Sequence, residues 1–182
     1  MSRAMKTNDE MNLYLVGYMG AGKTTIGKLL AEKLNRPFTD VDVYIENRYY
    51  QSVAGIFEKK EEAGFRELER SALLEISEFE NAIVSTGGGL PCFFDNMDLM
   101  NETGITIYLK TSVTDLLNRL HSNKQNRPLI KGKSMEELRN FIESSLKKRE
   151  PFYNQAKIII DVPYCPEKKE MNQWVDKLAS RF

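Results

Sequence analysis

The stretch Gly17-Tyr18-Met19-Gly20-Ala21-Gly22-Lys23-Thr24 fits the phosphate-binding pattern G-x-x-x-x-G-K-[ST], and it decides the fold of this chain. The run before it, residues 12–16, is short and apolar, as in a buried strand. Residues 25–34 after it place apolar side chains at helical spacing. A glycine-rich turn that merely precedes a helix is the alternative. Because strand, loop and helix occur in register, the sequence instead predicts a nucleotide-binding loop.

The residue types in this loop suit a phosphate ligand. Gly20 and Gly22 let the backbone turn its N–H groups toward an anion that larger side chains would block. The next helix begins at this point, so its unpaired N–H groups and positive dipole end face the same ligand. We expect Lys23 to reach the β- and γ-phosphates and the Thr24 hydroxyl to bind Mg²⁺.

Length favours one domain, or one domain with small insertions. The 182 residues can bury a proper core. The 26 basic and 26 acidic residues balance, so no positive charge excess favours nucleic-acid binding. Cys92 and Cys165 form no spacing motif, which favours two thiols in a reducing compartment. No signal-peptide pattern or membrane-length apolar run occurs, so we expect a cytoplasmic protein, with residues 1–10 as a frayed end.

Two acids follow the second expected strand, which runs through Phe38 after Pro37 has stopped the first helix. Asp40 and Asp42 lie at the strand end, the edge where open α/β sheets bind ligands. Strand alternation puts both side chains on one side if the strand continues that far. A helix start at Asp40 is the alternative, since aspartate is a good N-cap. Both interpretations can hold together.

The middle of the chain is expected to be helical, with one strand. Ser52 can cap a first helix, the charged residues 59–62 mark a corner, and a long helix follows over residues 63–79. Arg66 lies near the start of that helix. A lone helical arginine is usually solvated, but the helix dipole disfavours a cation there, which favours a partner. The strand over residues 82–86 comes next.

Three glycines, Gly87, Gly88 and Gly89, end that strand. A flexible turn needs only one or two, so three indicate a close approach of some group to the backbone. No aspartate precedes them, and Ser85 or Thr86 stands where phosphate-loop enzymes usually carry an acidic magnesium partner. Asp40 is therefore the candidate acid for the metal.

The last third alternates strands and helices. A strand is expected over residues 105–109, a helix over 113–120, a helix from the Ser134 capping box that Pro151 ends or kinks, a strand over 157–161 and a final helix. Between the first two helices, residues 121–133 are polar and basic, which suits a lid over an anion, although an ordinary surface loop is the alternative. The order β-α-β-α-α-β-β-α-lid-α-β-α predicts a parallel sheet with helices on both faces.

Taken in order, these motifs closely resemble those of the shikimate kinase family, from about Asn12 to about Phe182. The motifs are residues 17–27, Asp40-Val41-Asp42, Phe65-Arg66, Gly87-Gly88-Gly89, Arg127-Pro128-Leu129 and Arg149-Glu150-Pro151-Phe152-Tyr153. The resemblance implies a three-layer α/β/α fold of nucleoside monophosphate kinase type with a five-stranded parallel sheet. It also implies one domain over residues 1–182, with a substrate-binding segment at about 42–70 and a lid at about 121–133.

The resemblance further implies transfer of the γ-phosphoryl group of ATP to the 3-hydroxyl of shikimate, in the biosynthesis of aromatic amino acids. Asp42 would bind and activate the acceptor hydroxyl, Arg66 and Arg149 its carboxylate, and Arg127 of the lid the transferring phosphate. The implied metal residues are Thr24 and Asp40, with Mg²⁺ as cofactor. The implied acceptor contacts include Gly87, Gly88 and Gly89, with Phe57 and Phe65 lining the ring pocket. The implied ATP contacts are Gly20, Ala21, Gly22, Lys23, Thr24, Thr25 and Arg119.

Two other functions stay open at this point. The adenine side matches the family less well, because either Arg119 or Leu120 stands at the place of the base-stacking arginine. The loop of residues 161–166 also departs from the family's pattern. Another small-molecule kinase, of gluconate kinase type, shares the loop and sheet but needs neither two carboxylate-binding arginines nor three glycines. A nucleotide-binding regulatory module leaves Asp42 and Arg127 unexplained. We expect a monomer that binds neither nucleic acid nor membrane.

Overall fold

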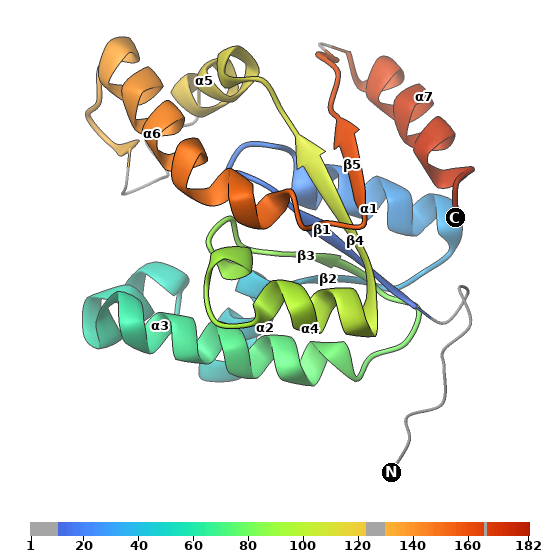
Figure 1. Cartoon of the computed structure of the whole chain (residues 1–182), viewed down its shortest axis with the longest axis horizontal. Helices are drawn as coiled ribbons and strands as arrows, with labels where there is room; N and C mark the ends of the chain where they lie inside the picture. The colour runs from blue at the N-terminus through green and yellow to red at the C-terminus, as the bar shows by residue number, and fades with distance from the viewer. Residues whose placement is uncertain (1–10, 123–129, 166) are drawn as a thin grey trace.

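The computed structural model describes residues 11–122, 130–165 and 167–182, and within them five parallel strands form one sheet in the order β2-β3-β1-β4-β5 (Figure 1). The strands are β1 (Asn12–Val16), β2 (Phe38–Asp40), β3 (Ile83–Ser85), β4 (Gly104–Lys110) and β5 (Ile158–Asp161). The helices are α1 (Lys23–Leu34), α2 (Val41–Tyr49), α3 (Val53–Ser77), α4 (Asn96–Thr103), α5 (Val113–Ser122), α6 (Met135–Tyr153) and α7 (Lys168–Ala179), with the 3₁₀ turn η1 (Leu90–Cys92).

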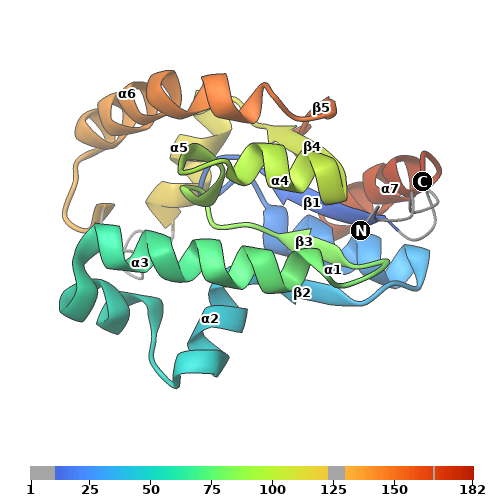
Figure 2. The same ribbon diagram turned by 60° about the horizontal axis from the view of Figure 1, so that its bottom comes forward.

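The helices cover both faces of the sheet, as predicted. Connections between parallel strands are almost always right-handed. The chain passes from β1 over β3 to β2 and then returns across the sheet to β3, β4 and β5. This reversal puts α1 on one face and α3, α4 and α6 on the other. α7 packs against α1, and α3 packs against α4. Figure 2 shows α4 and α6 across the sheet from α1 and α7.

The core is centred on β1, which pairs with β3 on one side and β4 on the other. All five residues of β1 are buried, in keeping with a parallel strand covered on both faces. Ile83 and Ile107 on the neighbouring strands are likewise fully buried. Among the described helices none is long and apolar enough to cross a membrane.

The predicted element order is wrong between β3 and β4, where it contains no helix. The structure places η1 and α4 there. Met97 and Met100 are buried in α4, but so are the polar Asn96 and Thr103, so its apolar periodicity is weak. Both strands pair in parallel with β1, and parallel strands need a long crossover, which is the signal that predicts a helix here.

The predicted corner at residues 59–62 is confirmed. α3 breaks at Glu61, whose φ of 57° and ψ of −175° are not helical. The two helices expected on either side are therefore the two parts of α3, and the Ser52 hydroxyl caps the first by accepting from the Gly55 N–H at 3.1 Å. Pro151 does not end α6, which continues to Tyr153.

The carboxyl ends of β1, β2 and β3 meet at one edge of the sheet. Leu15 and Asp40 each pair in register with Ser85. The phosphate loop, the start of α2 and residues 87–89 follow these strand ends and so lie side by side. β2 ends at Asp40, so strand alternation does not place Asp42, and the helix-start interpretation holds instead.

Candidate active site

The phosphate loop leaves the start of α1 open for an anion. Gly22 is the N-cap of α1, and no side chain caps the helix. Gly20 and Gly22 have φ values of 84° and 96°, a left-handed region that side chains disfavour. The first N–H groups of α1 and its positive dipole end therefore face the concave side of the loop, which suits the phosphates of a nucleotide.

Lys23 lies inside this loop. Its ammonium group donates to the carbonyl oxygens of Gly17 at 2.8 Å and Tyr18 at 2.9 Å. A cleft of about 460 Å³ opens in front of it. Its walls bring together residues from the phosphate loop, α1, α2, the triple glycine and α5, among them Lys23, Thr24, Thr25, Asp40, Asp42, Gly87, Gly88 and Arg119.

Oxygen donors gather at one end of the cleft. The Thr24 hydroxyl donates to Oδ2 of Asp40 at 2.8 Å and lies 3.5 Å from the Ser85 hydroxyl. Asp40 also caps α2, with its Oδ1 3.1 Å from the Asp42 backbone N. No group of three or more metal-ligating side chains occurs within the described residues. Mg²⁺ usually keeps several waters and takes one or two protein oxygens beside substrate phosphates, so a Thr24–Asp40 pair fits it.

Asp42 faces the glycine loop from the first turn of α2. A Cβ atom at Gly87 would lie 3.0 Å from its Oδ1. Burial raises the pKa of the Asp42 carboxyl, and the negative charge of Asp40 adds to the rise. The positive charges of Lys23 and Arg66 oppose it. A carboxylate with a raised pKa is a better proton acceptor near neutral pH, which suits a base acting on a hydroxyl group.

The other two glycines also touch functional segments. A Cβ atom at Gly88 would lie 3.2 Å from the backbone N of Met19 in the phosphate loop. A Cβ atom at Gly89 would lie 2.6 Å from Nη1 of Arg66. The close approach predicted from three consecutive glycines is thus present at each position of residues 87–89.

Arg66 is held among aromatic rings. Its guanidinium carbon lies 4.2 Å from the ring centroid of Phe93, 5.5 Å from that of Phe65 and 5.9 Å from that of Phe57. Phe57 and Phe65 stack on each other at 4.4 Å. These rings remove water from the guanidinium group, and ring faces attract cations. A desolvated guanidinium suits a small carboxylate ligand.

Two acids already pair with this guanidinium. Nη1 of Arg66 donates to Glu69 at 2.5 Å, and Nη2 donates to Glu62 at 2.8 Å. Glu69 is buried, whereas the Glu62 side chain is 62% exposed. The buried Nε of Arg66 has no hydrogen-bond partner among the described residues. Arg66 is therefore not a solvated surface charge, and it has a partner, as its place near a helix start suggests.

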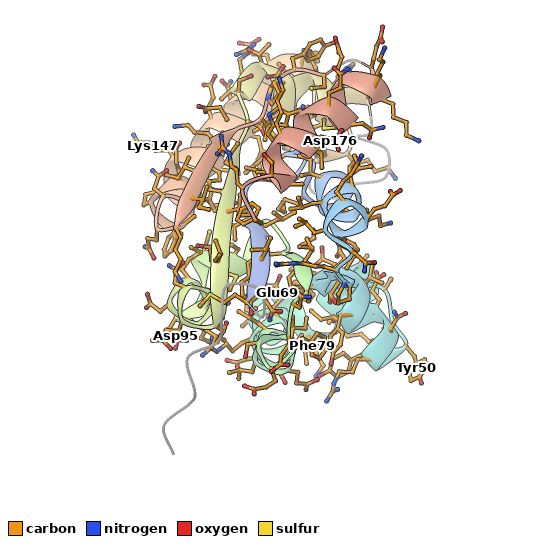
Figure 3. The ribbon with its side chains drawn as sticks, turned by 90° about the vertical axis from the view of Figure 1, so that its right-hand side faces the viewer. Tyr50, Glu69, Phe79, Asp95, Lys147 and Asp176 are labelled. Carbon is orange, nitrogen blue, oxygen red and sulfur yellow. The ribbon has the colours of Figure 1, made fainter. Side chains whose placement is uncertain are left out.

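Glu69 is the residue of this region that the sequence analysis missed. Figure 3 labels it in the interior of the molecule, in contrast to Tyr50 at the edge. Burial raises the pKa of Glu69 to about 7 against the opposing charge of Arg66. Its spacing in the sequence could have predicted its burial, because Glu69 lies on the same helical face as the buried residues Ala72, Leu73 and Ile76. An acid on that face needs a partner.

Arg149 reaches the same region from α6. Its guanidinium carbon lies 5.6 Å from the ring centroid of Tyr18. Burial raises the pKa of the Cys92 thiol to about 11, and the charges of Arg149 and Arg66 oppose the rise. Both arginines likewise act against the raised pKa of Glu69. The fold thus brings together two cations that are far apart in the sequence.

α5 also contributes to the wall of the cleft. Nη1 of Arg119 lies 3.3 Å from the carbonyl oxygens of Gly20 and Ala21. The Leu120 side chain instead packs under the loop, where a Cβ atom at Gly20 would lie 3.1 Å from it. Both residues line the cleft, and Arg119 supplies its positive charge beside the phosphate loop.

The predicted lid, residues 121–133, is described only at its two ends. Arg127, the candidate for the transferring phosphate, lies outside the described residues. At the near end His121 is exposed, and at the far end Ile130 is fully buried. The buried Ile130 anchors the segment that leads into α6.

Comparison with known proteins gives a consistent result. The sequence model of the family described as shikimate kinase matches residues 19–179. The chain is 49% identical over 168 residues to a shikimate kinase of Bacteroides thetaiotaomicron, covering 92% of this chain and 96% of that one. It is 56% identical over 149 residues to a shikimate kinase of Parabacteroides distasonis, covering 82% and 86%.

Solved structures agree. A crystal structure of shikimate kinase from Bacteroides thetaiotaomicron superposes with a TM-score of 0.90 at 48% identity, covering 94% of this chain and 97% of that one. Shikimate kinase from Acinetobacter baumannii in complex with shikimate superposes with a TM-score of 0.82 at 35% identity, covering 96% of each chain. The resemblance in sequence therefore extends to the fold.

Proposed function

The chain belongs to the shikimate kinase family and phosphorylates shikimate with ATP, and we propose that the cleft between the phosphate loop and the triple glycine is where this transfer occurs. The observation that carries the proposal is that Lys23, Asp42 and Gly88 line one cleft. Arg66 and Arg149 lie next to it, and the charges of both act on Glu69 and Cys92. The nucleoside monophosphate kinase type of fold is shared with solved shikimate kinases.

On the donor side, we propose that the phosphate loop holds the β- and γ-phosphates. The uncapped start of α1 supplies N–H groups, and Lys23 supplies a charge at the loop centre. Thr25 and Arg119 line the same cleft and complete the proposed ATP site, with Gly20, Ala21, Gly22 and Thr24. Phosphoryl transfer asks a protein mainly for positioning and for neutralisation of charge, and this arrangement does both.

On the acceptor side, we propose that Asp42 orients the 3-hydroxyl of shikimate and accepts its proton. Its raised pKa and its place opposite the glycine loop support this role. The carboxylate of the acceptor would bind Arg66 and Arg149, since a guanidinium group offers a planar fork of donors. Gly87, Gly88 and Gly89 would let the ring approach the backbone closely.

For the metal, we propose Mg²⁺ held by the Thr24 hydroxyl, with Asp40 binding it through water. The metal supplies charge neutralisation between the phosphates when bound. Asp40 orients Thr24 and at the same time caps α2, the helix that carries Asp42. The same carboxylate would thus link the metal side to the acceptor side.

We also propose a substrate-binding segment at about residues 42–70 and a lid at about 121–133 that brings Arg127 onto the transferring phosphate. The segment holds Asp42, Arg66 and the aromatic rings around it, which supports the first assignment. We also propose that the enzyme acts as a monomer. The need for ATP supports a cytoplasmic location.

An acceptor panel tests the proposed function. ADP release would be measured with ATP and Mg²⁺ in the presence of shikimate, gluconate and neutral cyclic polyols. We expect rapid turnover with shikimate alone, and loss of turnover when EDTA removes the metal. Equal turnover with gluconate would instead favour the gluconate-kinase type of acceptor site, and ADP release without any acceptor dependence would contradict a kinase site.

A further inference from the structure

Tyr153 makes a contact that neither the phosphate loop nor the acceptor arginines explain. It is the last residue of α6 and is fully buried. Its hydroxyl group donates to the carbonyl oxygen of Gly88 at 2.5 Å. The bond joins residues 65 positions apart, and it runs from the helix that carries Arg149 to the middle of the glycine loop.

The ring of Tyr153 has little freedom to move. It packs on the ring of Tyr108 in β4, with the centroids 5.2 Å apart and the planes at 39°. The other edge of Tyr108 contacts the phosphate loop, where a Cβ atom at Gly17 would lie 3.6 Å from the ring. The ring of Tyr153 therefore packs against the strand that runs beside the nucleotide site.

The hydroxyl group also stays protonated. Burial raises the pKa of Tyr153 well above its ordinary value of 10.0, although the nearby charge of Arg149 opposes the rise. The raised pKa favours the protonated hydroxyl group, which is the form that donates to Gly88. Arg149 lies one helical turn earlier on α6, and its positive charge interacts with the same hydroxyl group.

From this geometry we infer that Tyr153 is a positioning residue for the acceptor. Its hydroxyl group fixes the distance between Gly88, where the acceptor ring would lie, and Arg149, which would bind the acceptor carboxylate. It also holds Gly88 against Met19 of the phosphate loop, and so aligns the acceptor with the donor phosphates. The inference rests on the proposed function, because it presupposes that Arg149 and the glycine loop bind the acceptor.

A phenylalanine at this position removes the hydroxyl group and keeps the packed ring. Tyr153→Phe leaves the partly buried Gly88 carbonyl without this donor, so the loop can shift relative to α6. The matched control is Tyr14→Phe. The Tyr14 side chain is also fully buried, and its hydroxyl group lies 3.0 Å from that of Thr103 at the other end of the sheet.

Steady-state kinetics of the two variants distinguish positioning from plain stability. We expect Tyr153→Phe to raise the KM for shikimate and to lower kcat/KM for shikimate about ten-fold, with the KM for ATP changed less than about two-fold. Tyr14→Phe should lower the thermal midpoint by a similar amount and leave all three kinetic values unchanged. In hydrogen exchange, the amides of residues 88–90 should exchange faster in Tyr153→Phe only.

Other outcomes overturn the inference. If Tyr153→Phe keeps the parent KM for shikimate while Arg149→Ala raises it, Tyr153 is a structural tyrosine and the proposed acceptor site stands. If Arg149→Ala also keeps the parent KM, the acceptor assignment itself fails, and Tyr153 has nothing to position. Equal kinetic losses in Tyr153→Phe and Tyr14→Phe would attribute the effect to general destabilisation.

Discussion

The guanidinium group of Arg66 and the carboxylate of Glu69 form a buried ion pair one helical turn apart, with Nη1 2.5 Å from Oε2. Breaking such a pair by removing one partner leaves a buried charge uncompensated, at a cost of about 3–5 kcal/mol. Glu69 therefore fixes the side chain that we propose as an acceptor ligand. A substitution at Arg66 should therefore keep a positive charge beside Glu69.

The first prediction concerns pH. The pKa of Glu69 rises to about 7 in the folded protein from 4.5, so between these values the folded state binds more protons than the unfolded state. The free energy of unfolding should accordingly fall as pH rises from about 5 to 7, by up to about 1.4 kcal/mol per pH unit. Asp42 steepens the effect, and Arg66 and Arg149 reduce it.

Urea denaturation of the parent and of Glu69→Gln at pH 5, 6, 7 and 8 measures this effect. The difference in unfolding free energy between the two proteins should change by more than about 1 kcal/mol over the window. Glu67→Gln, an exposed acid on the same helix, should follow the parent at each pH. A constant difference between parent and Glu69→Gln would contradict the raised pKa.

The second prediction concerns the break in α3. Glu61 has φ 57° and ψ −175°, a combination that is essentially restricted to glycine and costs about 1–3 kcal/mol for other residues. Glu61→Gly should therefore raise the thermal midpoint. Glu58→Gly, at an exposed helical position three residues earlier, should lower stability by about 1 kcal/mol. A lower midpoint for Glu61→Gly than for the parent would show that the break carries no strain.

The third prediction concerns the nucleotide. Lys23→Ala should reduce kcat at least about 100-fold, because the charge at the loop centre that would face the transferring phosphate is lost. Lys33→Ala removes a lysine at the other end of α1 that pairs with Asp176, and it should keep the parent kcat. Circular dichroism would verify that both proteins fold. Parent turnover in folded Lys23→Ala would remove the phosphate-loop assignment.

The fourth prediction separates the two acids. Asparagine is as good an N-cap as aspartate, so Asp40→Asn should preserve α2 while weakening the metal site. Raising Mg²⁺ should restore part of its activity. Asp42→Asn loses the proposed proton acceptor, and added Mg²⁺ should not rescue it. Matching Mg²⁺ titrations for the two variants would contradict the division of roles.

The sequence predicted the sheet, its parallel strands and the elements at its ligand-binding edge, because hydrophobic periodicity and glycines at the ends of elements are local signals. It failed at α4, whose four buried positions include two polar residues. Strand alternation would place Asp40 and Asp42 on one side only if the strand continued, but the strand ends at Asp40 and the alternative of a helix start holds. Helix capping by Asp40 competes with strand extension, and the local pattern does not decide between them.

The site was predictable as a set of residues but not as a set of contacts. Glu69 and Tyr153 act through partners 3 and 65 positions away, and the partner of Tyr153 is a backbone carbonyl group that no side-chain pattern encodes. Arg66 and Arg149 are each plausible surface cations in the sequence. Their common electrostatic effect on Glu69 and Cys92 arises only in the folded chain.

The last prediction addresses the acceptor carboxylate. Each arginine should supply a charge-assisted hydrogen bond of roughly 1.5–3 kcal/mol, so its loss should raise the KM for shikimate about ten-fold or more. Arg149→Ala tests one side. Arg66→Lys tests the other, because it keeps a positive charge beside Glu69 but loses the planar fork. Arg70→Lys is the matched control, because Arg70 also pairs with an acid, Asp95 at the start of α4.

The most direct measurement compares shikimate with an analogue that lacks the carboxylate, in the parent, Arg66→Lys, Arg149→Ala and Arg70→Lys proteins. The proposed site predicts that both acceptor-site variants raise the KM for shikimate at least about ten-fold, with the KM for ATP nearly constant. It also predicts that the analogue is a poor acceptor for the parent and loses little more in these variants. An unchanged KM for shikimate in both variants, or equal use of the analogue by the parent, would contradict it.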